Sequence, residues 1–135
     1  MHVVDDGGLS LDDLVGAWEM EWVETTTEDG ATTLTRPPEI SGIITYTPDG
    51  HMCAFFLSDR SIDGFNFAAY AATVSFEEGR VVHRVLLGTP PTDAGTTQLR
   101  DGVLDRSTGA LTLSGQVGTA RKTLRWHRLP AHASS

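Results

Sequence analysis

The sequence predicts an all-β protein, an antiparallel barrel or sandwich of short strands. Apolar and polar residues alternate along most segments, and helical spacing is nearly absent after residue 16. Glycine-containing turn sequences recur at near-regular intervals: EDG at 28–30, PDG at 48–50, EG at 78–79 and RSTG at 106–109. The 135 residues suffice for one domain, 1–135, with a core at 11–129.

Nine segments are expected to form strands. They are residues 17–27, 31–35, 41–47, 51–57, 71–77, 80–88, 96–105, 110–116 and 120–129. Before them, SLDDLVG at 10–16 predicts a short N-terminal helix, with Ser10 as its N-cap and Gly16 at its end. Residues 58–70 predict a long connector that covers the mouth of the barrel.

The first and last strands complement each other as an antiparallel pair, which favours a closed barrel over a sandwich. Opposite charges and aromatic rings would face one another along this seam. The inner pairs would be Trp18–Arg128, Met20–Trp126, Trp22–Leu124 and Glu24–Lys122, and the outer pairs Glu21–Arg125 and Glu19–His127. Nine up-and-down strands would make the closing pair parallel, so the 58–70 connector or an extra N-terminal strand must restore parity.

Composition and charge exclude several classes of function. Lys and Arg total 10 against 18 Asp and Glu, a net charge of −8, so neither nucleic acid nor an anionic membrane is an expected partner. The single cysteine, Cys53, allows no internal disulfide. The N-terminus lacks the basic and apolar regions of a signal peptide, so a soluble, cytoplasmic protein is expected.

Four segments together resemble the bacterial lipocalin-like domain family of small stand-alone proteins. They are LVGAWEMEWVE at 14–24, YTPDGHM at 46–52, VVHRV at 81–85 and GTTQLR at 95–100. The resemblance implies a lipocalin-type (calycin) up-and-down barrel, closed at one end by Trp18 under Arg128 and open to ligand at the other. Similar small bacterial barrels include plain binders and cofactor-free cyclases, isomerases or lyases of biosynthetic intermediates.

A histidine within the valine-rich segment at 80–88 is the main candidate for chemistry. By alternation His83 shares the inner face with Val81, Val85 and Leu87, while Arg84 lies outside. Such a histidine is more often a satisfied core residue than a catalyst. Its expected neighbours decide between the two interpretations.

The neighbours come from the segment GTTQLR. Either Gln98 and Arg100 point inward, or Leu99 does; the family resemblance favours the former. An inward Arg100 needs a carboxylate, carbonyl oxygens or a ligand anion. Tyr46 shares a face with the apolar Ile44 and is expected inside, either as a proton donor or as a rim aromatic.

The predicted function is a cofactor-free enzyme that cyclises, isomerises or cleaves a small hydrophobic, polyketide-like intermediate bearing a polar or anionic group. The alternatives are a non-catalytic binding protein for a small hydrophobic ligand and, more weakly, a barrel with a filled core. No metal is expected, because the histidines lack ligand spacing, and a homodimer is compatible with the sequence. The expected catalytic residues are His83, Arg100 and Tyr46; the expected substrate-binding residues are Trp22, Phe65, Phe67, Tyr70, Gln98 and Trp126.

Overall fold

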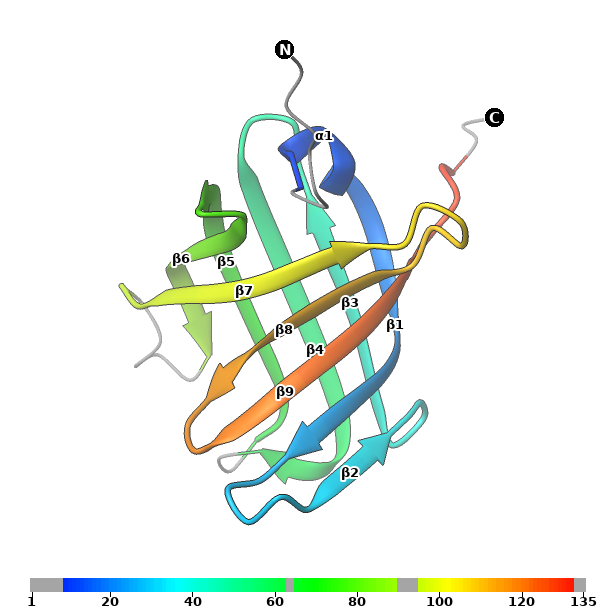
Figure 1. Ribbon diagram of the computed structural model, residues 1–135, viewed down its shortest axis with the longest axis vertical. Helices are drawn as coiled ribbons and strands as arrows, with labels where there is room; N and C mark the ends of the chain where they lie inside the picture. Colours follow the sequence, from blue (N-terminus) through cyan, green and yellow to red (C-terminus); the bar gives the residue numbers. More distant parts are fainter. Residues whose placement is uncertain (1–8, 63–64, 90–94, 133–135) are drawn as a thin grey trace.

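A computed structural model describes residues 9–62, 65–89 and 95–132, and it confirms the all-β prediction (Figure 1). One short helix, α1, precedes nine strands. The elements are α1 (Leu11–Leu14), β1 (Gly16–Thr26), β2 (Thr32–Thr35), β3 (Ile40–Tyr46), β4 (His51–Ile62), β5 (Phe65–Glu77), β6 (Arg80–Thr89), β7 (Thr97–Leu104), β8 (Leu111–Val117) and β9 (Ala120–Arg128).

Eight of the nine strands close an antiparallel up-and-down barrel. The order is β1-β3-β4-β5-β6-β7-β8-β9, and β9 pairs back onto β1. The ninth strand, β2, pairs with the end of β1 through Thr26 and Thr32, whereas β3 pairs with its start through Gly16 and Tyr46. β2 and β3 therefore occupy one edge of β1 in succession and count as a single interrupted strand. This arrangement restores parity, and neither the connector nor an extra N-terminal strand is needed.

The prediction of a mouth-covering connector at 58–70 is wrong. β4 runs to Ile62 and β5 begins at Phe65, so most of this segment extends two long paired strands. Two residues, 63 and 64, lie outside the described part of the chain. The aspartates and the glycine of the segment suggested a loop, but the apolar run FNFAAY has the β propensity and the pairing partners to remain in the sheet.

The closed end is built around Trp18, as the sequence predicts. The indole is fully buried and donates from Nε1 to the Leu14 carbonyl over 2.9 Å. The Arg128 guanidinium lies 4.2 Å from its ring centroid and donates to the backbone carbonyls of Asp13 and Val15. At Gly16, φ is +124° and a Cβ would lie 2.7 Å from Arg128 Nη1, so glycine alone fits between α1 and the arginine.

The closing pair β1–β9 has the predicted register only over its first part. Trp18–Arg128 and Met20–Trp126 pair as expected, but a bulge between Met20 and Trp22 moves the rest by one residue. Val23 then lies inside, while Trp22 turns to the outer face opposite Arg125. The predicted outer contacts form nevertheless. Glu21 contacts Arg125 at 3.0 Å, and Glu19 contacts His127 at 3.3 Å.

A second bulge changes the facing of β6. Ala72 pairs with Val85 but Ala71 pairs with Leu87, which leaves Leu86 as the extra residue. Leu87 was expected beside His83 on the inner face; it is instead 72% exposed on the outer face.

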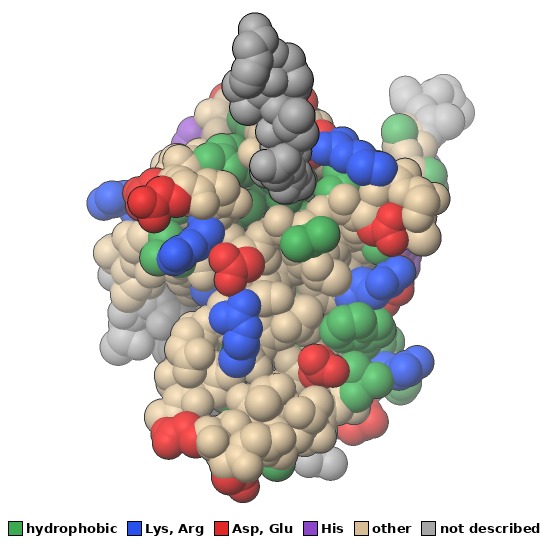
Figure 2. All heavy atoms as spheres, in the orientation of Figure 1, with side chains coloured by type: hydrophobic (Ala, Val, Ile, Leu, Met, Phe, Trp, Pro, Cys, Tyr) green, Lys and Arg blue, Asp and Glu red, His purple; other side chains and the backbone are tan. Residues whose placement is uncertain are grey.

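No helix in the described ranges is both long and apolar enough to cross a membrane. On the face that β7–β9 present, basic and acidic side chains are interspersed (Figure 2).

Candidate functional site

The barrel encloses a cavity of about 250 Å³. All eight barrel strands contribute residues to its wall, and the appended strand β2 contributes none. Aliphatic and aromatic side chains form most of the wall, including Met20, Ile44, Phe56, Leu113 and Trp126. The polar part consists of Tyr70, His83, Thr89, Gln98, Arg100 and Lys122. This volume suits a small molecule and is below the size of a typical drug-sized pocket.

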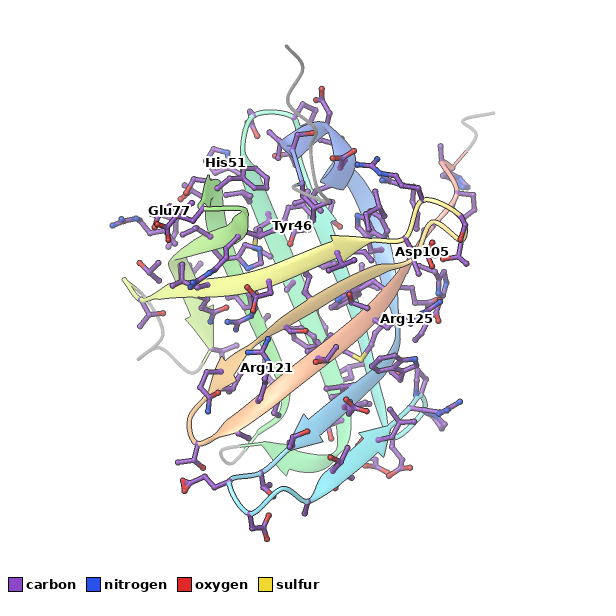
Figure 3. The ribbon with its side chains drawn as sticks, viewed as in Figure 1. Tyr46, His51, Glu77, Asp105, Arg121 and Arg125 are labelled. Atoms are coloured by element: carbon purple, nitrogen blue, oxygen red, sulfur yellow. The ribbon has the colours of Figure 1, made fainter. Side chains whose placement is uncertain are left out.

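His83 lies on the inner face of β6, only 1% exposed, between two tyrosines. Tyr46 on β3 places its hydroxyl 2.8 Å from Nε2, and Tyr70 on β5 places its own 3.2 Å from Nδ1. Figure 3 shows Tyr46 behind β7, in the part of the barrel nearest α1. Both ring nitrogens are thus held by phenol groups, which orient the imidazole and connect it to Tyr70 on the cavity wall.

The environment keeps this trio uncharged. Burial, and then the positive charge of Arg100, lowers the pKa of His83 from 6.5 to about 3. Burial also raises the pKa of the Tyr46 hydroxyl well above 10, with a smaller contribution from Tyr70. At neutral pH the imidazole is neutral, so one nitrogen donates and the other accepts. The trio is therefore a neutral hydrogen-bonded chain that ends at the cavity.

Arg100 reaches the cavity from β7 and has only neutral acceptors among the described residues. Its Nη1 donates to the Leu99 carbonyl over 2.9 Å, and its Nη2 donates to Gln98 Oε1 over 3.2 Å. A Cβ at Gly115 of β8 would lie 2.7 Å from Nη1, so this glycine makes room for the guanidinium in the barrel wall. The half-buried cation retains donors for an anion or a carbonyl oxygen.

On the outer side of the same wall, the positive charge of surface arginines is compensated by a carboxylate. An external hollow between β7 and β8 is lined by Arg100 together with Arg80, Asp101 and Arg121. Asp101 contacts Arg121 at 3.0 Å and Arg80 at 3.7 Å, and Figure 3 labels Arg121 on β9. The carboxylate nearest to Arg100 in sequence is therefore engaged by two surface arginines.

Trp126, an expected substrate-binding residue, lines the cavity, and its buried Nε1 is the one buried side-chain polar atom in the described ranges that lacks a hydrogen-bond partner. Lys122, which was not recognised as functional from the sequence, also lines the cavity. It was expected to pair with Glu24, but the bulge in β1 turns Glu24 outward and places Thr25 opposite the lysine. Alternation along β9 does signal an inward Lys122; the missing partner could not be read from the sequence.

The electrostatics of the cavity are opposite to those of the chain. The chain carries a net charge of −8, yet the described lining holds Arg100 and Lys122 and no Asp or Glu. The lining therefore has two cationic donors and no carboxylate to compensate them. A ligand that offers an anionic or strongly accepting oxygen on an apolar body would satisfy them.

The structure brings together most of the predicted site residues. His83, Gln98 and Arg100 face one cavity, as predicted, and Tyr70 and Trp126 line it too. Tyr46 is inside the barrel but contacts His83 and is not part of the cavity wall. Two residues that were expected to contact the ligand, Trp22 and Phe67, also lie outside the cavity wall.

Trp22 is outside because of the bulge in β1. Phe67 is outside because β5 continues as a strand, in which odd-numbered residues face outward; its ring is 38% exposed and stacks on Phe55 at 6.2 Å between centroids. The side chain of Phe65 lies outside the described part of the structure. Among the residues described, no three His, Cys, Asp or Glu side chains cluster in a way that could hold a metal ion.

The chain was also compared with known proteins. A redesigned beta barrel of solved structure is similar with a TM-score of 0.49 and 17% sequence identity, over 89% of this chain and 95% of that one. No family model matches the chain, and no curated protein matches it. The resemblance of the four sequence segments to the bacterial lipocalin-like domain family stays a prediction.

Proposed function

We propose that the barrel takes up a small, largely apolar molecule with an anionic or enolisable oxygen and transfers a proton within it, without a cofactor. The observation that carries the proposal is the pair of cationic donors in an apolar cavity: Arg100 and Lys122 have no carboxylate among the described lining residues. Such donors, fixed before the ligand arrives, stabilise negative charge that develops on an oxygen.

The proton transfer runs through Tyr70 and His83. A C–H bond of the bound molecule breaks, and its electron pair remains on the molecule as an enolate whose oxygen is held by Arg100. The proton passes to the Tyr70 oxygen while the Tyr70 hydroxyl proton moves to Nδ1 of His83, 3.2 Å away. Nε2–H donates meanwhile to Tyr46, which acts as a positioning residue.

The reverse transfer delivers a proton to another atom of the enolate, so substrate and product are isomers and no co-reactant is consumed. A cyclisation follows if the enolate carbon instead attacks a carbonyl carbon of the same molecule and the resulting alkoxide takes the proton. The low pKa of His83 opposes protonation in the empty cavity, but the negative enolate beside Arg100 would stabilise the imidazolium.

The second candidate function is binding without chemistry. Two observations favour it: both nitrogens of His83 are already engaged by tyrosines, and the pKa of about 3 makes the imidazole a weak base. In this case the trio would serve to shape the cavity, and Arg100 and Lys122 would hold an anionic head group.

Ligand charge is the first test, and it applies to both functions. Cinnamate, an apolar carboxylate of suitable size, is expected to bind at least about tenfold more tightly than the neutral cinnamamide, a difference of about 1.4 kcal/mol. The double variant Arg100→Met/Lys122→Met should lose this preference, whereas Arg84→Met on the outer face of β6 should keep it. Isothermal titration calorimetry gives the six affinities, of two ligands for three proteins. Equal binding of acid and amide by the native protein would contradict the proposed site.

Proton exchange separates enzyme from binder. In D₂O the native protein should accelerate exchange of the carbon-bound protons of 4-oxopentanoate, an enolisable keto acid, and His83→Ala should lower that acceleration by roughly a hundredfold. NMR follows the exchange, and circular dichroism checks that the variant is folded. Exchange no faster than in buffer, or equal rates for both proteins, would leave binding as the function.

A further inference from the structure

The outer surface of β3–β6 is apolar where a solvated sheet face would be polar. Outward side chains on these strands include Ile43, Phe55, Leu57, Phe67 and Leu87, each between 38% and 72% exposed. We call this surface the outer apolar face; its floor is completed by Cys53, Ala69 and Ala71. In Figure 1 these strands form the far wall of the barrel, behind β7–β9.

Sequence patterning marks the same surface. Residues 52–57 of β4 (MCAFFL) and 67–72 of β5 (FAAYAA) are uninterrupted apolar runs, whereas β9 alternates, with Leu124 and Trp126 inside and Arg125 and His127 outside. A strand with one solvated face alternates, while continuous apolar runs are typical of strands covered on both faces. The inner face of β4 and β5 is covered by the barrel core. The pattern therefore indicates that their outer face is covered as well.

The exposed apolar area of this face is large enough to form the centre of a dimer interface. At about 200 Å² for a fully exposed large apolar residue, the five exposed side chains offer roughly 500 Å². A standard interface buries about 800 Å² per partner, with an apolar centre and a polar rim. The outer apolar face thus supplies more than half of what each subunit needs. It is also at the upper end of the apolar patches that monomers expose.

Charge and shape both favour a second copy of this chain as the occupant. None of the eight residues of the outer apolar face is charged, so two copies can meet there although each carries a net charge of −8. A hollow of about 510 Å³ lies over Ala69 and Ala71, beside the stacked rings of Phe55 and Phe67. A two-fold axis would bring the rings of each subunit against the hollow of the other, as a self-complementary interface requires.

We infer that the protein is a homodimer whose subunits pack through the outer apolar face. This inference is independent of the proposed function, because none of its large side chains lines the cavity. Light scattering after size-exclusion chromatography should give twice the 14.5 kDa of one chain at tens of micromolar protein. A native mass of one chain at that concentration would overturn the inference.

Two variants locate the interface. Phe55→Asp and Leu87→Asp should each shift the protein to the monomer, with at least a hundredfold weaker association, because each would bury an unpaired carboxylate in the apolar interface. Val103→Asp is the matched control: Val103 is 59% exposed on β7, away from the face, and its variant should remain dimeric. Circular dichroism confirms that all three fold. Dimers in both of the first two variants would overturn the assignment.

Cys53 provides a second measurement. Its thiol is exposed in the single chain, so a thiol reagent should react slowly with the native dimer and at least tenfold faster with Phe55→Asp. Equally fast reaction of both proteins would place the interface elsewhere. Phosphatidylcholine vesicles test the competing occupant. Native protein that co-sediments with such vesicles as a monomer would mean that lipid covers the face, contrary to the inference.

Discussion

Replacing Trp18 by Ala is expected to lower the free energy of unfolding by about 3–5 kcal/mol. The indole is fully buried at the closed end, and its removal leaves a cavity that α1 and the strands cannot fill. The Leu14 carbonyl would lose its donor, and Arg128 would lose the ring beneath its guanidinium. Urea denaturation, followed by far-ultraviolet circular dichroism, gives the difference in unfolding free energy.

Trp22→Ala is the matched control, because it removes the same side chain from the same strand. Trp22 is half-buried on the outer face, so its loss opens no internal cavity and should cost clearly less than the loss of Trp18. The sequence-based register, with both rings inside, would instead make the two losses similar. A cost for Trp18→Ala below about 1 kcal/mol would contradict the description of the closed end.

Acid is expected to destabilise the protein through His83 before the carboxylates titrate. In the unfolded chain this histidine takes up a proton near pH 6.5, whereas in the folded barrel its pKa is about 3. Below pH 6.5 the unfolded state therefore binds more protons, and the unfolding free energy falls by up to about 1.4 kcal/mol per pH unit. The loss should continue to about pH 3, where it amounts to on the order of 4–5 kcal/mol.

The variant His83→Gln isolates this contribution, because glutamine does not titrate and can still hydrogen bond to Tyr46. The difference in unfolding free energy between the native protein and the variant should be constant above pH 7. From pH 6 to pH 4 it should move in favour of the variant, and the subtraction cancels the other titrating groups. Parallel stability curves for the two proteins would show that His83 is protonated as readily in the folded state as in the unfolded one.

The parts of the fold that depend on simple alternation could be predicted. The turns, the nine strands, the Trp18–Arg128 contact and the inward His83 all follow from a period of two between Gly-containing turns. These predictions use only local spacing and the complementarity of neighbouring strands. The cavity shared by His83 and Arg100 was predicted with the help of the family resemblance, because alternation alone left either Arg100 or Leu99 as the inward residue.

The errors come from places where the period is interrupted. Each bulge inserts one residue, and no residue type marks it, so Trp22 and Leu87 were placed on the wrong side of the wall. Phe67 was misplaced because aspartate and glycine near residue 60 resemble a loop, although pairing between β4 and β5 overrides that preference. The unpartnered indole N–H of Trp126 depends on the positions of several strands at once, which spacing along one strand cannot specify.

The bulge in β1 has a consequence for how this chain could change in length over evolutionary time. Deleting Glu21 would make the ladder regular and leave every later pair of β1 and β9 as it is, with Val23 opposite Leu124 and Thr25 opposite Lys122. Glu24 would stay on the outer face, opposite Thr123, so the lysine would gain no internal counterion. A one-codon deletion at the bulge is thus a change that descendants of this barrel could accept without altering which residues of β1 face the cavity.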